Sequence, residues 1–190
     1  MAMATFTSKR ERVLWACAGI ALLAITATLL LSETLVGLIA ERRFIDQTFF
    51  FGFLIILVAI VIVQGFQNLY GAFTVGTILA IGAVYLLVFL RMTLPEERSH
   101  LIEYSVVALF TYGALVERKR NGANLPVPAA ILAIALTTLV GVLDECAQLF
   151  IPSRVFDWFD MLFNFLAALM AVTGSVLLAW INQKVRQIRS

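Results

Sequence analysis

Long apolar runs alternate with short polar segments along this chain. Six runs reach or approach the roughly 20 apolar residues that an α-helix needs to cross the hydrocarbon core of a bilayer. They cover residues 13–31, 49–66, 71–90, 101–116, 125–151 and 158–181. The pattern predicts an all-α fold, a polytopic membrane bundle of about six transmembrane helices.

The run at 101–116 differs from the others because it is shorter and contains Glu103. It predicts either a tilted or partly buried span or a helix that lies at the membrane interface. The fifth run has clear limits, since Pro126 and Pro128 precede it and Pro152 follows it. Proline cannot continue the helical hydrogen-bond ladder, so we expect the fifth helix to end before Pro152.

The composition supports a membrane protein. Hydrophobic residues make up 62% of the chain and charged residues 14%, against roughly half and a quarter in ordinary globular domains. We expect one membrane domain over residues 1–190, in which 1–92 form three helices without a motif and 93–183 form a three-helix region. We therefore expect the lipid bilayer to be a partner of this protein. The cysteines, Cys17 and Cys146, are too few and too scattered for a disulfide framework and are expected to be free thiols.

The distribution of basic residues predicts the orientation. Lysine and arginine in short loops are retained on the cytoplasmic side. If the N-terminus lies inside, all three lysines, Lys9, Lys119 and Lys184, fall on that side, and nearly all acidic residues fall outside. This favours an even number of spans with both termini in the cytoplasm, which requires the run at 101–116 to span. The net charge is only +2, and no basic stripe is interleaved with aromatics, so no nucleic-acid partner is expected.

Three groups of polar residues fall at the predicted outer face, each at the end of a helix. They are His100, Glu103 and Tyr104; Asp144, Glu145 and Gln148; and Arg154, Asp157, Asp160 and Asn164. Helical spacing places Asp144 and Gln148 on one face, with Glu145 about a quarter turn away. Because ionisable groups at membrane depth are costly, their convergence predicts a polar site.

Each group also has a structural explanation. His100 and Glu103 suit the lipid headgroup layer, and Asp144 and Glu145 suit a solvated helix end. Arg154 and Asp157 suit a salt bridge, and Asn164 suits an interhelical hydrogen bond. Convergence of all these residues on one side of the bundle favours a site.

At these residues the chain resembles the VanZ-like family of small bacterial membrane proteins, over about residues 99–171. The resemblance lies in His100-x-x-Glu103-Tyr104, Asp144-Glu145-x-x-Gln148-Leu149-Phe150-Ile151-Pro152-x-Arg154 and Asp157-x-x-Asp160-x-x-x-Asn164. One departure is Ala167-Ala168, where members often carry glycine, which concerns helix packing more than chemistry. The family's namesake is linked to resistance to the glycopeptide teicoplanin, and members occur beside envelope polysaccharide genes. The resemblance implies a bacterial cytoplasmic-membrane protein of the cell envelope, with no agreed activity.

Three functions remain open from the sequence. The first is binding of a lipid-linked envelope precursor or a glycopeptide at the outward polar site, where Arg154 would hold a phosphate or carboxylate. The second is a structural subunit that contacts a membrane-protein partner through its first three helices. The third is an enzyme in which His100 or a carboxylate acts as general base and the other oxygens hold a divalent cation, Mg²⁺ or Ca²⁺. A transporter is disfavoured, because the polar residues lie at one end of the helices and not at the midplane.

Overall fold

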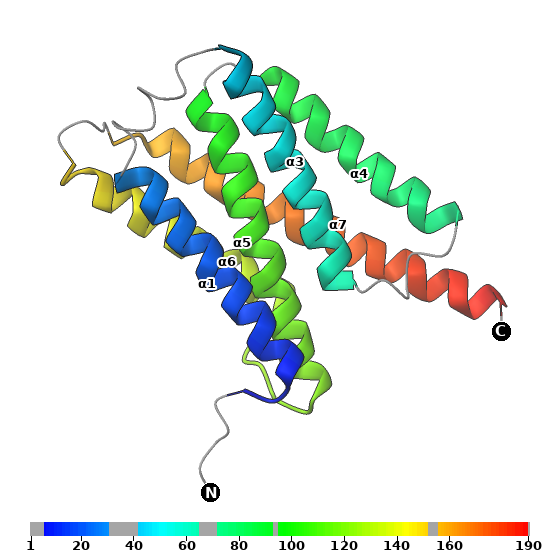
Figure 1. Cartoon of the computed structure of the whole chain (residues 1–190). Helices are drawn as coiled ribbons and strands as arrows, with labels where there is room; N and C mark the ends of the chain where they lie inside the picture. The colour runs from blue at the N-terminus through cyan, green and yellow to red at the C-terminus, as the bar shows by residue number, and fades with distance from the viewer. Residues whose placement is uncertain (1–5, 31–41, 65–71, 93–94, 152–155, 190) are drawn as a thin grey trace, which may run out of the picture.

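The computed structural model describes residues 6–30, 42–64, 72–92, 95–151 and 156–189. Within them the chain forms helices and no strand, which confirms the all-α prediction. The helices are α1 (Lys9–Leu30), α3 (Arg42–Gln64), α4 (Ala72–Arg91), α5 (Pro95–Arg120), α6 (Ala129–Gln148) and α7 (Trp158–Arg189). Figure 1 shows them as one bundle in which α1 and α4 lie on opposite sides.

Helix α5 is the centre of the bundle. It packs against α1, α3, α6 and α7, and 72% of its segment Arg98–Arg120 is buried inside the protein. This explains why its sequence is the least apolar of the predicted spans, since its polar groups face other helices and not lipid. The structure therefore favours the partly buried span over a helix lying at the interface.

Four helices in the described residues are long and apolar enough to cross a membrane. They are the segments Thr74–Arg91, Arg98–Arg120, Ala129–Gln148 and Trp158–Ile188. In α3 the described apolar part is shorter, Leu54–Gln64. The prediction of a helical membrane bundle is confirmed, whereas the count of six spans stays a prediction.

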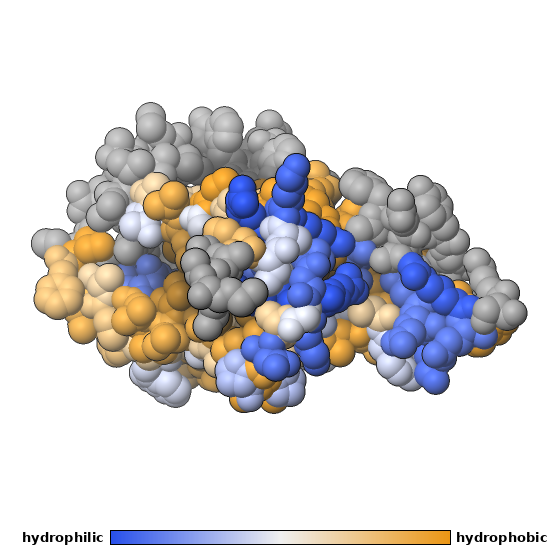
Figure 2. All heavy atoms as spheres, turned by 90° about the horizontal axis from the view of Figure 1, so that it is seen from below, coloured by the Kyte–Doolittle hydropathy of each residue, from blue (hydrophilic) through white to orange (hydrophobic). Residues whose placement is uncertain are grey.

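Contacts between helix ends show that α1 runs antiparallel to α3 and α5. Arg118 near the end of α5 pairs with Glu11 near the start of α1, with 2.9 Å between Nη1 and Oε1. Arg10 donates to the backbone carbonyl of Val63 near the end of α3 at 2.8 Å. We call this the basic end of the bundle. Figure 2 views the bundle from below, the side of the N-terminal end of α1, and shows hydrophilic side chains gathered on a mainly hydrophobic surface.

Polar side chains also link helices inside the bundle. The hydroxyl groups of Tyr85 on α4 and Ser105 on α5 lie 2.9 Å apart in the buried interior. Gln64 at the end of α3 donates to the backbone carbonyl of Ser175 on α7 at 2.9 Å. Such hydrogen bonds are a common way to hold helices together where lipid supplies no hydrophobic driving force. Cys17 and Cys146 are free, as predicted.

Candidate functional site

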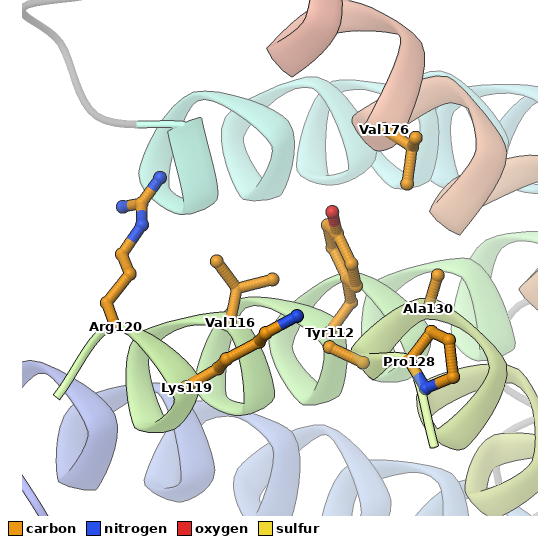
Figure 3. Close-up of a pocket in the computed structure, with 8 residues that line it drawn as sticks. Tyr112, Val116, Lys119, Arg120, Pro128, Ala130 and Val176 are labelled. Atoms are coloured by element: carbon orange, nitrogen blue, oxygen red, sulfur yellow. The ribbon is translucent and has the colours of Figure 1, made fainter. Parts of the chain in front are cut away.

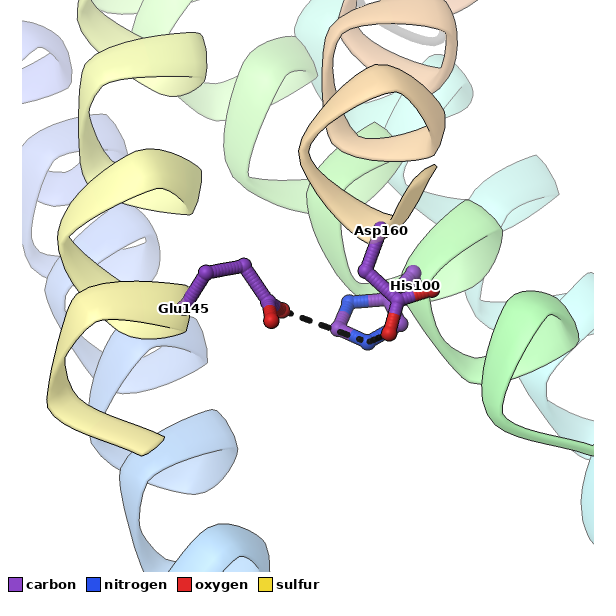
Figure 4. Close-up of side chains that lie close together, drawn as sticks. All are labelled: His100, Glu145 and Asp160. Atoms are coloured by element: carbon purple, nitrogen blue, oxygen red, sulfur yellow. Dashed lines mark ion pairs between the residues drawn. The ribbon is translucent and has the colours of Figure 1, made fainter. Parts of the chain in front are cut away.

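Three helix ends bring His100, Glu145 and Asp160 together, as Figure 4 shows. His100 lies near the start of α5, Glu145 near the end of α6 and Asp160 in the first turn of α7. The Nε2 atom of His100 is 3.8 Å from Oε1 of Glu145 and 3.6 Å from Oδ2 of Asp160. One donor atom from each residue lies within 4.8 Å of the other two. The structure thus brings three of the predicted site residues together, and their use as a site stays a prediction.

The Glu145 carboxylate is the most deeply buried member of this cluster. Its side chain is 0% exposed, against 10% for His100 and 16% for Asp160. Gln148 donates from Nε2 to Oε1 of Glu145 at 2.9 Å. The second oxygen, Oε2, has no hydrogen-bond partner among the described residues. A buried carboxylate oxygen without a partner destabilises the folded protein. A contribution to stability therefore does not explain why Glu145 is buried here.

Helices α6 and α7 approach each other closely about one helical turn further into the bundle than Glu145 and Asp160. Gly141 on α6 faces Asn164 on α7, and a Cβ atom added to Gly141 would lie 2.7 Å from the Cβ of Asn164. Asn164 is completely buried, and in the described part of the chain neither of its amide atoms has a hydrogen-bond partner. The expected interhelical hydrogen bond of Asn164 is therefore not observed. Sequence reasoning overlooked Gly141, although a small residue one turn before Glu145 is the signal of a close helix contact.

Helix α6 turns the side of Glu145 and Gln148 into the bundle. Gln148 donates to Glu145 one turn before it, and both of these side chains are buried. Asp144 is only half-buried. The register is set by the packing of α6 on α5 and α7, which sequence periodicity does not fix.

The other predicted site residues take different positions. Tyr104 is fully buried and its ring stacks near that of His100, with 5.9 Å between centroids. Glu103 is half-buried on α5. Asp157 is exposed, and its Oδ1 accepts a hydrogen bond from the backbone N–H of Phe159 at 2.8 Å, so it caps the N-terminus of α7. Arg154, and with it the expected salt bridge to Asp157, lies outside the described residues.

A separate groove lies toward the other end of α5, as Figure 3 shows. Its volume is about 570 Å³, and it is lined by Tyr112, Val116, Lys119, Arg120, Pro128, Ala129, Ala130 and Val176. Tyr112 follows His100 by about 18 Å along the helix axis. The groove therefore contains none of the predicted site residues.

The fold is that of a multi-pass helical membrane protein, and a cluster of polar side chains lies between α5, α6 and α7. The chain belongs to the VanZ/LLP1 family, whose model matches residues 53–181. This match includes α4 and part of α3 in addition to the three helices that carry the polar residues. No curated protein and no solved structure matches the chain.

Proposed function

We propose that this protein binds an envelope-related ligand, lipid-linked or glycosylated, at the cluster of His100, Glu145 and Asp160. The supporting observation is the convergence of these side chains from three helices inside the family-matched region. Lipid-facing surface needs no such cluster, and ionisable groups within membrane bundles are generally kept for a function.

The position of the cluster supports an outward-facing site. His100 lies near the start of α5, whereas Arg118, Lys119 and Arg120 form its last turn. Because basic residues are retained in the cytoplasm, the end that carries His100 faces outward in the bacterial cytoplasmic membrane. Lipid-linked envelope precursors and glycopeptides are found on that side.

The chemistry of the side chains suits a ligand rich in hydroxyl or amine groups. Glu145 and Asp160 accept hydrogen bonds, and a carboxylate forms its strongest ones with charged donors. Asp160 is the most exposed of the three and marks the side from which a ligand reaches the cluster. In the sequence Arg154 lies between Glu145 and Asp160, and its guanidinium would suit a phosphate or carboxylate group of the ligand.

A structural role is the second candidate, and the exposure of α4 favours it. Only 11% of Thr74–Arg91 is buried inside the protein. At Gly76 an added Cβ would meet no atom within 4 Å. A small residue on an open helix face permits close packing with another membrane helix.

Native mass spectrometry of the protein released gently from its own membrane tests both candidates. We expect a non-protein mass on the wild type that is lost in Glu145→Ala and in Asp160→Asn, but kept in the control Glu117→Gln at the other end of α5. A ligand mass that survives both site variants would contradict the proposal. A constant protein partner that survives Glu145→Ala and dissociates in Gly76→Leu would establish the structural role instead.

A further inference from the structure

We propose that His100, Glu145 and Asp160 bind a divalent transition-metal ion of the zinc or manganese class. One imidazole nitrogen and two carboxylate oxygens form the ligand set, and they come from three different helices. Mg²⁺ and Ca²⁺ are held by oxygen ligands. An imidazole ligand instead favours a first-row transition metal, which changes the metal class expected from the sequence.

The distances fit ligands around one ion better than they fit hydrogen bonds. At 3.6 and 3.8 Å, the His100 nitrogen is too far from Asp160 and Glu145 for a hydrogen bond to either. Two ligand atoms bonded at about 2.1 Å to a tetrahedral ion lie about 3.4 Å apart. The two distances from His100 would therefore need to shorten by only a few tenths of an ångström. The ligand atoms of Glu145 and Asp160, which lie within 4.8 Å of each other, would also have to close on the ion.

The surroundings of Glu145 supply an independent observation. This carboxylate is completely buried, and its Oε2 has no hydrogen-bond partner in the part of the chain that the structure describes. An ion bound by both oxygens of the Glu145 carboxylate would satisfy Oε2 as well as the nearer Oε1, and it would balance the charge of the two carboxylates. Gln148, which donates to Oε1 at 2.9 Å, is placed to orient the carboxylate as residues next to metal ligands commonly do.

Three protein ligands leave a coordination position open, as in catalytic and not structural zinc sites. A water molecule, or a phosphate or hydroxyl oxygen of a bound ligand, fills such a position. That use of the ion rests on the proposed function, whereas binding of the ion does not. The two are therefore tested separately.

Metal analysis of the purified, tag-free protein in detergent is the direct test. The protein is stripped with a chelator, titrated with Zn²⁺, Mn²⁺, Mg²⁺ or Ca²⁺, and measured by elemental mass spectrometry and thermal unfolding. We expect about one Zn²⁺ or Mn²⁺ per chain and a rise in Tm that Mg²⁺ and Ca²⁺ do not reproduce.

Variants locate the ion. His100→Ala, Glu145→Gln and Asp160→Asn should each abolish both the bound metal and the rise in Tm. Gln148→Ala should weaken metal affinity about 10- to 100-fold, and Glu117→Gln, at the other end of α5, should bind as the wild type does. Circular dichroism and gel filtration of the stripped proteins show whether each variant is folded.

Two results would overturn the metal site. One is stoichiometric metal that persists in folded Glu145→Gln and Asp160→Asn protein. The other is a wild type that takes up no metal while Arg154→Ala lowers its Tm, because a guanidinium would then neutralise the carboxylates. Bound metal without any organic mass in the native spectrum would refute the proposed ligand and leave the metal site intact.

Discussion

Two completely buried glutamates, Glu11 and Glu145, lie at opposite ends of the bundle and have very different surroundings. Glu11 accepts hydrogen bonds from the backbone and side chain of Thr7 at 2.5 and 2.6 Å and pairs with Arg118 at 2.9 Å. Glu145 accepts a hydrogen bond from Gln148 on Oε1, and among the described residues its Oε2 has no hydrogen-bond partner. The two side chains are equally buried, but in the described part of the chain only in Glu11 do both carboxylate oxygens have a hydrogen-bonding partner.

The difference separates a structural carboxylate from a functional one. Ser8 accepts a hydrogen bond from the backbone N–H of Glu11 at 3.0 Å, so Glu11 belongs to the N-terminal cap of α1. Through Arg118 it also fastens α1 to the end of α5. Every contact of Glu11 thus stabilises the fold. The contacts of Glu145 leave bonding capacity unused, which is what a site that receives a ligand or an ion requires.

The largest expected effect is a difference in stability between Glu11→Gln and Glu145→Gln. Removing the charge of Glu11 weakens its bonds to Arg118 and Thr7 and should lower the free energy of unfolding by about 2 kcal/mol. Glu145→Gln should change it by less than about 0.5 kcal/mol or increase it, because the substitution removes a poorly satisfied buried charge. Titration of metal-stripped protein with a denaturing detergent measures both.

Metal stripping is essential to this comparison, since a bound ion would stabilise only the protein with an intact Glu145. Arg118→Gln is the matched control, because it removes the same ion pair from the other side. Equal losses in Glu11→Gln and Glu145→Gln would show that the two carboxylates do not differ in role.

A smaller effect is expected from pH. Burial raises the pKa of Glu11, but the hydrogen bonds from Thr7 and the Arg118 guanidinium outweigh it and hold the pKa below its usual value of 4.5. The stabilisation is therefore complete above that pH and is lost as the pH falls through the lowered pKa of the folded state.

Thermal unfolding at a series of pH values tests the sign. The Tm difference between the wild type and Glu11→Gln should be constant near neutral pH and shrink below about 4.5. Other carboxyl groups titrate in both proteins and cancel in the difference. A difference that grows on acidification would mean that the pKa of Glu11 is raised.

The apolar runs predicted the helices well, but they did not predict what lies between them. The run at 101–116 predicts a short tilted or partly buried span, or a helix at the interface, whereas α5 covers Pro95–Arg120. The helix is longer than the apolar run because its last turn, which ends in the exposed Lys119 and Arg120, is polar and yet helical. Periodicity likewise showed that Asp144 and Glu145 face different ways, but which of them turns inward depends on the close contact of Gly141 with Asn164. Such contacts join residues far apart in the sequence, and a single sequence does not encode them visibly.

The smallest expected effect concerns Asp157, which the sequence grouped with the site. Its side chain caps α7 by accepting the N–H of Phe159. Asp157→Ala should therefore cost about 1 kcal/mol of unfolding free energy, whereas Asp157→Asn should cost only a few tenths, since asparagine caps helices about as well. Neither variant should alter metal uptake, because Asp157 is exposed and Asp160 supplies the oxygen from α7. Loss of metal in Asp157→Asn with unchanged stability would contradict this assignment. Asp157 would then belong to the metal site at the end of the bundle that carries Glu145, and its role would not be limited to capping α7.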